Sequence, residues 1–198
     1  MIIRTYQPED EKGWVRCRVL SFLNTAYYDN VLREKEKYDH PAIELVAEVD
    51  GMIAGLLDLE YEEEERTVCS RGTGLGGMIW HIAVHPDFQR RGIGAALLKE
   101  AARLAKKQGL NRMEAWTRDD RWVRAWYEKN GFVQKESYLH VYMNGEDELK
   151  GTVPAGLKDL YPVKVFAHYT GEDTAMIKNS FKRVHECVCY ERECSIIC

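Results

Sequence analysis

The sequence has no long apolar run, no excess of positive charge and no leader-like start. None of its apolar segments is long enough to cross a bilayer, and residues 1–6 lack the layout of a signal peptide. The net charge of −4 gives no electrostatic basis for nucleic acid as a main partner. We therefore expect one cytoplasmic globular domain with a substantial core, which contacts neither membrane nor nucleic acid.

One segment, residues 78–110, combines an apolar strand, a glycine turn and an amphipathic helix. Residues 78–84 are a short apolar run typical of a buried strand, and Pro86 ends it because proline cannot donate to a sheet ladder. After Gly92 and Gly94, apolar residues recur at helical spacing. The first amides of a helix lack internal partners and carry the positive end of the macrodipole, so this turn predicts a phosphate or pyrophosphate site.

Two common phosphate motifs do not fit this turn. A P-loop needs Gly-Lys-Ser/Thr, which is absent, and a dinucleotide fingerprint needs a third glycine where Leu97 stands. The hexapeptide from Gln89 to Gly94 instead resembles the Gln/Arg-x-x-Gly-x-Gly/Ala signature of the GNAT superfamily of N-acetyltransferases. The alternative is an ordinary strand–turn–helix whose glycines serve geometry alone.

A second motif supports the resemblance. The run from Trp126 to Phe132, with Tyr127 and Gly131, is similar to the family's Phe/Leu-Tyr-x-x-x-Gly-Phe motif. The order of expected elements also resembles the GNAT fold over residues 1–144. The resemblance implies an α/β (α+β) fold with a mixed, splayed central sheet flanked by helices.

The chain is expected to divide into an acetyltransferase domain (1–144), a linker (145–157) and a small C-terminal β-α-β appendage (158–198). The appendage is too short to fold alone, so it should pack on the domain, adding a strand to an exposed sheet edge, or on a second subunit of a homodimer. Within the domain, periodicity and turn residues predict strands at 2–7, 43–49, 52–61, 111–117, 132–137 and 139–143, and helices at 8–23, 25–35 and 120–130.

The resemblance also implies a cosubstrate, acetyl-coenzyme A, and an acceptor, the primary amine of a small molecule or peptide. The amine would attack directly in a ternary complex. The residues to which the resemblance assigns cofactor binding are Ile82, Ala83, Val84, Gln89, Arg90, Arg91, Gly92, Ile93, Gly94, Ala95 and Asp120. Asp120 stands where the family often has Asn, and an ionised Asp accepts hydrogen bonds but cannot donate them.

The resemblance makes Tyr127 the general acid for the leaving thiolate, and an aromatic ring that only fills the core is the alternative. No family base is visible on the fourth strand, where Met78 and Trp80 occupy the usual positions. Glu60 is our first candidate for the base, and His81 acting with a water chain is the second. His81 also fits a strand residue that is packed or hydrogen-bonded. The missing base leaves open a second function, a non-catalytic module that binds or senses coenzyme A.

Two further patterns have competing interpretations. Asp58, Glu60 and Glu62 share one face by period two, so they form either a solvated face or an acidic wall that attracts a cationic amine. The six cysteines should be reduced in a cytoplasmic protein. The four between residues 187 and 198 fit no standard zinc spacing, so we expect no metal and interpret them as small core residues.

Overall fold

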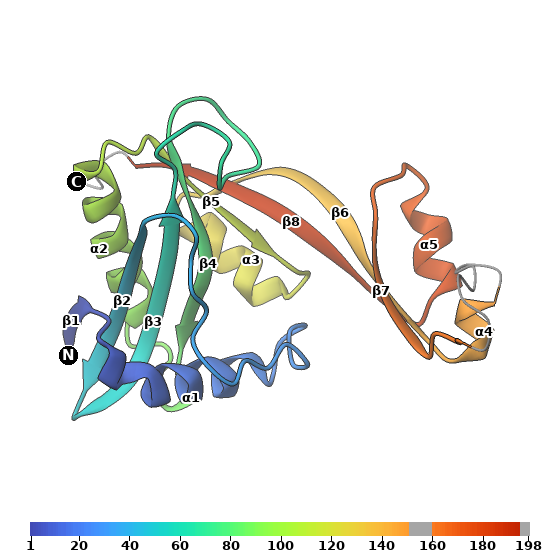
Figure 1. The fold of residues 1–198 in the computed structure, drawn as a ribbon, viewed down its shortest axis with the longest axis horizontal. Coiled ribbons are helices and arrows are strands. Elements are labelled where there is room, and N and C mark those ends of the chain that lie inside the picture. Colours follow the sequence, from blue (N-terminus) through green and yellow to red (C-terminus); the bar gives the residue numbers. More distant parts are fainter. Residues whose placement is uncertain (151–159, 195–198) are drawn as a thin grey trace.

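The computed structural model describes residues 1–150 and 160–194 (Figure 1). Its eight strands in these ranges form one sheet in the order β1-β2-β3-β4-β5-β8-β6-β7. The strands are β1 (Ile2–Thr5), β2 (Ala42–Val49), β3 (Met52–Tyr61), β4 (Gly76–Val84), β5 (Arg112–Thr117), β6 (Val133–Asn144), β7 (Lys164–Tyr169) and β8 (Arg183–Glu193). The helices are α1 (Glu11–Phe22), α2 (Ile93–Lys107), α3 (Arg121–Lys129), α4 (Glu146–Leu149) and α5 (Thr174–Ser180), with 3₁₀ turns at Pro8–Asp10 and Pro86–Phe88.

The two faces of the sheet have separate cores. On one face, Leu57, Leu59 and Ile79 pack beneath α2 and α3 in the largest apolar cluster. On the other face, Trp14 and Cys17 of α1 pack against β2, β3 and the end of β4. The structure thus confirms a mixed sheet with helices on both sides.

The sheet opens between β4 and β5. These strands are parallel, but their pairing runs only from Gly76↔Arg112 to Ile79↔Ala115. A register shift between Asp58 and Leu59 of β3 places an extra residue, Trp80, on β4 at the same level. The rest of β4 therefore has no strand partner on its β5 side, which is the splay that the family resemblance implies.

The β2–β3 hairpin forms as the sequence predicts. Asp50 and Gly51 have φ angles of 50° and 76°, which the two central positions of a type I′ turn require. The predicted helix at 25–35 is wrong, because the segment after α1 forms turns and bends. Its polar groups bind neighbouring elements instead: Lys35 and Glu36 pair with groups on the sheet.

The C-terminal part differs from the expectation in two respects. The two strands predicted at 132–137 and 139–143 are one continuous strand, β6, with a register irregularity between Gln134 and Glu136. β8 lies inside the sheet between β5 and β6, and not at an exposed edge. This position gives hydrogen-bond partners to both neighbours, so the last strand of the predicted appendage completes the central sheet.

The far ends of β6, β7 and β8 form an arm that projects from the main body and carries α4 and α5 (Figure 1). A small third core, which includes Leu139, Val141 and Ile177, holds it together. The division at residue 144 stays a prediction, and residues 151–159 of the linker and appendage lie outside the described range. In the described ranges, no helix has both the length and the apolar character needed to cross a bilayer.

Candidate functional site

The glycine turn leaves the first amides of α2 without a side-chain cap. Gly92 is the N-cap residue with φ 79°, and Arg90 before it also has a positive φ of 61°. A Cβ at Gly92 would have no neighbour within 4 Å, whereas one at Gly94 would lie 3.4 Å from the Trp126 ring. The turn is exposed at Arg90, Arg91 and Gly92. The geometry thus fits an anion that approaches the backbone closely.

Side chains of the turn tie it to the end of β4. Gln89 Nε2 donates to the Val84 carbonyl (3.1 Å), and Arg91 donates to the Asp87 carbonyl (2.9 Å). The Ser21 hydroxyl donates to the same Val84 carbonyl at 2.8 Å. Ile93 is buried under the sheet, while Ala95 is exposed one turn into the helix. The residues predicted to bind the pyrophosphate therefore lie together at one end of α2.

Ile82, Ala83 and Val84 lie on the part of β4 that has lost its β5 partner. Their other edge pairs with β3, where Leu56 faces Ala83 and Gly55 faces Val84. A strand with one free edge can accept an extended ligand as an added strand. The free edge fits the predicted binding of the cofactor at these residues. The Val84 carbonyl, however, already accepts hydrogen bonds from Ser21 and Gln89.

Asp120 is the N-cap residue of α3, but its side chain does not cap the helix. Its carboxylate accepts a hydrogen bond from the Ala26 backbone N–H at 2.8 Å. Burial raises the pKa of Asp120. The side chain thus anchors the segment after α1, and its contact with the cofactor stays a prediction.

Tyr127 is buried on α3, with 4% of its surface exposed. Its ring stacks on Tyr190 of β8 at 5.5 Å and contacts Phe132 edge-on at 5.1 Å. Burial raises the pKa of the phenol, so it stays protonated at neutral pH. The ring therefore contributes to the core whether or not its hydroxyl also serves catalysis.

The three carboxylates of the predicted acidic face are all buried, so the solvated interpretation is wrong. Asp58 pairs with Lys35 (3.1 Å) and accepts a hydrogen bond from the Tyr38 hydroxyl (2.9 Å). Glu60 accepts hydrogen bonds from the His40 backbone N–H (2.9 Å) and from Trp80 Nε1 (2.6 Å). Each carboxylate thus has partners in the protein, which an open acidic wall would not have.

Glu62 holds the glycine-containing loop that follows β3. Its carboxylate accepts hydrogen bonds from the backbone amides of Arg66 (2.8 Å), Cys69 (3.0 Å) and Gly76 (2.8 Å). Arg112 lies 3.5 Å away as a counter-charge. These contacts tie the loop to the sheet at both ends.

His81 has a hydrogen bond at each ring nitrogen. Arg18 Nε donates to Nδ1 at 3.2 Å, and Nε2 lies 2.6 Å from a Glu36 oxygen. The arrangement assigns the ring proton to Nε2, because Nδ1 must accept from arginine. Nothing in the sequence pattern pointed to Arg18 or Glu36, since they reach His81 from α1 and from an irregular segment.

The cysteines Cys17, Cys69, Cys187, Cys189 and Cys194 are buried and unpaired, while Cys198 lies outside the described residues. Burial raises the pKa of Cys187 to about 11, so it is a neutral thiol in the core. Within residues 1–150 and 160–194, no group of three potential ligands could hold a metal ion.

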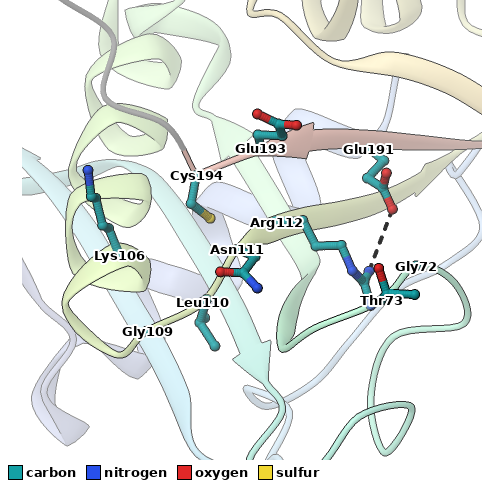
Figure 2. A pocket seen from close by; sticks show the side chains of 10 residues that line it. All are labelled: Gly72, Thr73, Lys106, Gly109, Leu110, Asn111, Arg112, Glu191, Glu193 and Cys194. Atoms are coloured by element: carbon teal, nitrogen blue, oxygen red, sulfur yellow. Dashed lines mark ion pairs between the residues drawn. The ribbon is translucent and has the colours of Figure 1, made fainter.

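A cavity of about 660 Å³ lies away from the glycine turn, at the C-terminal end of α2 (Figure 2). Lys106, Asn111, Arg112 and Glu191 are among the residues that line it. Arg112 and Glu191 form an ion pair across it at 3.7 Å. No predicted site residue lines this cavity.

Comparison with known proteins agrees with this geometry. The acetyltransferase (GNAT) domain family matches residues 41–134. An acetyltransferase of Pectobacterium atrosepticum is 31% identical over 124 residues, which are 61% of this chain and 78% of that protein. An acetyltransferase of Sodalis glossinidius is 28% identical over 144 residues, 70% of this chain and 92% of its own.

Two solved structures share the fold. The ribosomal-protein-S18-alanine N-acetyltransferase of Escherichia coli has a TM-score of 0.56 at 14% identity and covers 100% of this chain and 96% of its own. The PaiA N-acetyltransferase of Thermoplasma acidophilum, solved with coenzyme A, has a TM-score of 0.52 at 16% identity. The match covers 68% of this chain and 90% of that protein. From these relatives and the site geometry, the chain belongs to the GNAT acetyltransferase family and is an acyltransferase.

Proposed function

We propose that this protein transfers an acetyl group from acetyl-coenzyme A to a primary amine of a small molecule or peptide. The observation that carries the proposal is the uncapped start of α2 beside the opening between β4 and β5. The first supplies amides for a pyrophosphate, and the second supplies a free strand edge for an extended arm. Acetyl-coenzyme A contributes the activated thioester.

Binding of the cofactor and catalysis would involve different residues of this chain. The turn from Gln89 to Ala95 would hold the pyrophosphate, and the free edge at Ile82 to Val84 would align the pantetheine arm. The Tyr127 phenol would donate a hydrogen bond to the departing thiolate, which lowers the barrier as charge develops. Glu60 stays the proposed base, since a carboxylate with two hydrogen bonds keeps further lone pairs.

Binding of coenzyme A tests the first half of the proposal. Gly94→Glu places bulk against Trp126 and negative charge beside the pyrophosphate. We expect the folded variant to lose at least tenfold in affinity by calorimetry, with Gln108→Glu at the other end of α2 as the charge-matched control, because it also adds one negative charge at an exposed position. Equal affinity in Gly94→Glu and wild type would refute the site.

Tyr127→Phe tests the acid. The change removes only the hydroxyl, for which no hydrogen bond is present among the described residues, so folding should be unchanged. We expect turnover to fall on the order of 10²-fold, as for one lost acid catalyst, with coenzyme A affinity near normal. Unchanged turnover would mean that the ring only fills the core.

A module that binds coenzyme A without turnover is the second candidate. The specific observation in its favour is that both nitrogens of His81 and both oxygens of Glu60 already have partners. Thiol release from acetyl-coenzyme A with a panel of amines separates the two functions. Intersecting initial-rate lines would support direct attack in a ternary complex, whereas parallel lines would contradict it.

A further inference from the structure

Two tryptophans lie beside the opening of the sheet, one on each strand. The last β4–β5 pair is Ile79↔Ala115, and the next residue along each strand is Trp80 and Trp116. Trp80 is 48% exposed and Trp116 is half-buried. Core packing does not explain the exposure of the Trp80 ring.

Both rings lie on the face opposite α2 and α3. Glu62 and Glu114 both pair with Arg112 at 3.5 Å, so these even-numbered positions share a face. Glu60 shares it with Glu62 by period two. Trp80 hydrogen-bonds Glu60 and Trp116 hydrogen-bonds Glu114, which places both indoles there.

Each indole N–H donates to a buried carboxylate. Trp80 Nε1 lies 2.6 Å from Glu60, and Trp116 Nε1 lies 2.9 Å from Glu114. Glu60 is 6% exposed and Glu114 is fully buried. Negative charge at the N–H edge increases the electron density of the ring, and a tryptophan face is the strongest aromatic partner of a cation.

We propose that Trp80 and Trp116 form the two walls of an acceptor site that holds the ammonium of the amine substrate by cation–π contact. The inference rests on the proposed function and names its substrate class. The acceptor enters from this face because Trp80 is exposed on it beside the opening, beyond the part that α1 covers, whereas α2 and α3 cover the opposite face. The buried carboxylates behind the rings make the site favour a cation over an anion or a neutral analogue.

A row of rings continues from this site onto the arm. Trp116 contacts Tyr138 at 5.2 Å, Tyr138 contacts His168 at 4.7 Å, and His168 contacts Phe166 at 5.1 Å. Phe166 is 50% exposed on β7. The body of the acceptor therefore has an aromatic surface to lie on, which favours an amine with an aromatic or apolar body.

A non-reactive cation tests the site without turnover. Choline carries a quaternary ammonium, and 3,3-dimethylbutan-1-ol has the same shape without the charge. Titration of the full chain, followed by the NMR signal of the ligand methyl groups, should give saturable choline binding and about tenfold weaker binding of the alcohol. Equal binding of the two, or no binding of choline, would overturn the inference.

Variants locate the binding. Trp80→Leu and Trp116→Leu should each weaken choline about tenfold and raise KM for amines. Trp116→Leu should change kcat little, because its partner Glu114 has no proposed catalytic role, whereas Trp80→Leu also removes a hydrogen bond to the proposed base Glu60. Trp122→Leu, which removes an exposed tryptophan on α3, is the matched control and should change neither. Trp80→Phe and Trp116→Phe keep a ring and should bind between wild type and the leucine variants. Wild-type choline affinity in both leucine variants would overturn the assignment.

The same protein samples separate this inference from the proposed function. If the wild-type protein binds no coenzyme A or acetylates no amine, the proposed function is refuted. If wild type acetylates amines normally and neither leucine substitution changes choline affinity or KM, only the ammonium site is refuted. Benzyltrimethylammonium should bind more tightly than tetramethylammonium, and Phe166→Ala should reduce that difference if the substrate body lies on the arm.

Discussion

Glu62 is the best position at which to test how the loop beside the opening is held. Glu62→Gln keeps the shape of the side chain but replaces one carboxylate oxygen by an NH₂ group. The remaining oxygen can still accept from Arg66 and Cys69, whose amides share one oxygen in the wild type. The NH₂ group then faces the Gly76 N–H and Arg112, which are both donors.

The expected cost follows from these contacts. One charge-assisted hydrogen bond to a backbone amide contributes about 1.5–3 kcal/mol, and a buried donor left without a partner costs about 1–3 kcal/mol. Arg112 keeps Glu114 at 3.5 Å and Glu191 at 3.7 Å, so it does not become an isolated charge. We expect the free energy of unfolding to fall by about 3–5 kcal/mol, because these losses partly overlap.

Urea unfolding followed by circular dichroism measures this change, and the slope m should stay constant if only the native state is affected. Glu63→Gln is the matched control, since Glu63 is exposed in the same loop and should change stability by less than about 0.5 kcal/mol. A loss below about 1 kcal/mol in Glu62→Gln would show that the loop is held by other contacts.

Two further predictions concern the arm. Burial and the nearby Arg118 charge lower the pKa of His140 from its ordinary 6.5 to about 4, so between these values the unfolded chain binds a proton that the folded chain does not. Stability should therefore fall by about 1–3 kcal/mol as pH drops from 6.5 to 4, and pH-dependent urea unfolding should show a smaller fall in His140→Gln. Truncation after Asn144 removes β7 and β8, the strands that pair with β6, so we expect an insoluble product. A soluble fragment as stable as the full chain would contradict the sheet order.

The elements with strong local signals were predictable from the sequence. Asp50-Gly51 specified the hairpin, and the residues from Gln89 to Gly94 specified the turn into α2. The failures involve long-range contacts. Turn-like backbone after α1 is stabilised by partners such as Asp58 and His81, which are distant in sequence. Propensity alone could not reveal them.

The candidate site shows the same limit. Period two correctly grouped Asp58, Glu60 and Glu62 on one face, but it could not show that other segments bury these three carboxylates. From the sequence, Trp80 is only a residue that occupies a position where the family often has a base. Its hydrogen bond to Glu60 and its position opposite the start of the free β5 edge depend on a bulge that leaves no clear pattern in the sequence.

The position of β8 has a consequence for how the chain is made. β8 joins β5 and β6, yet it is synthesised after both of them. Until residues 183–193 leave the ribosome, each of these strands has an open hydrogen-bonding edge, and open edges pair readily with other chains. The contacts that close them also span long sequence separations, which slows folding. The period of greatest risk of aggregation is therefore the interval between synthesis of β6 and arrival of β8, and not the life of the folded protein.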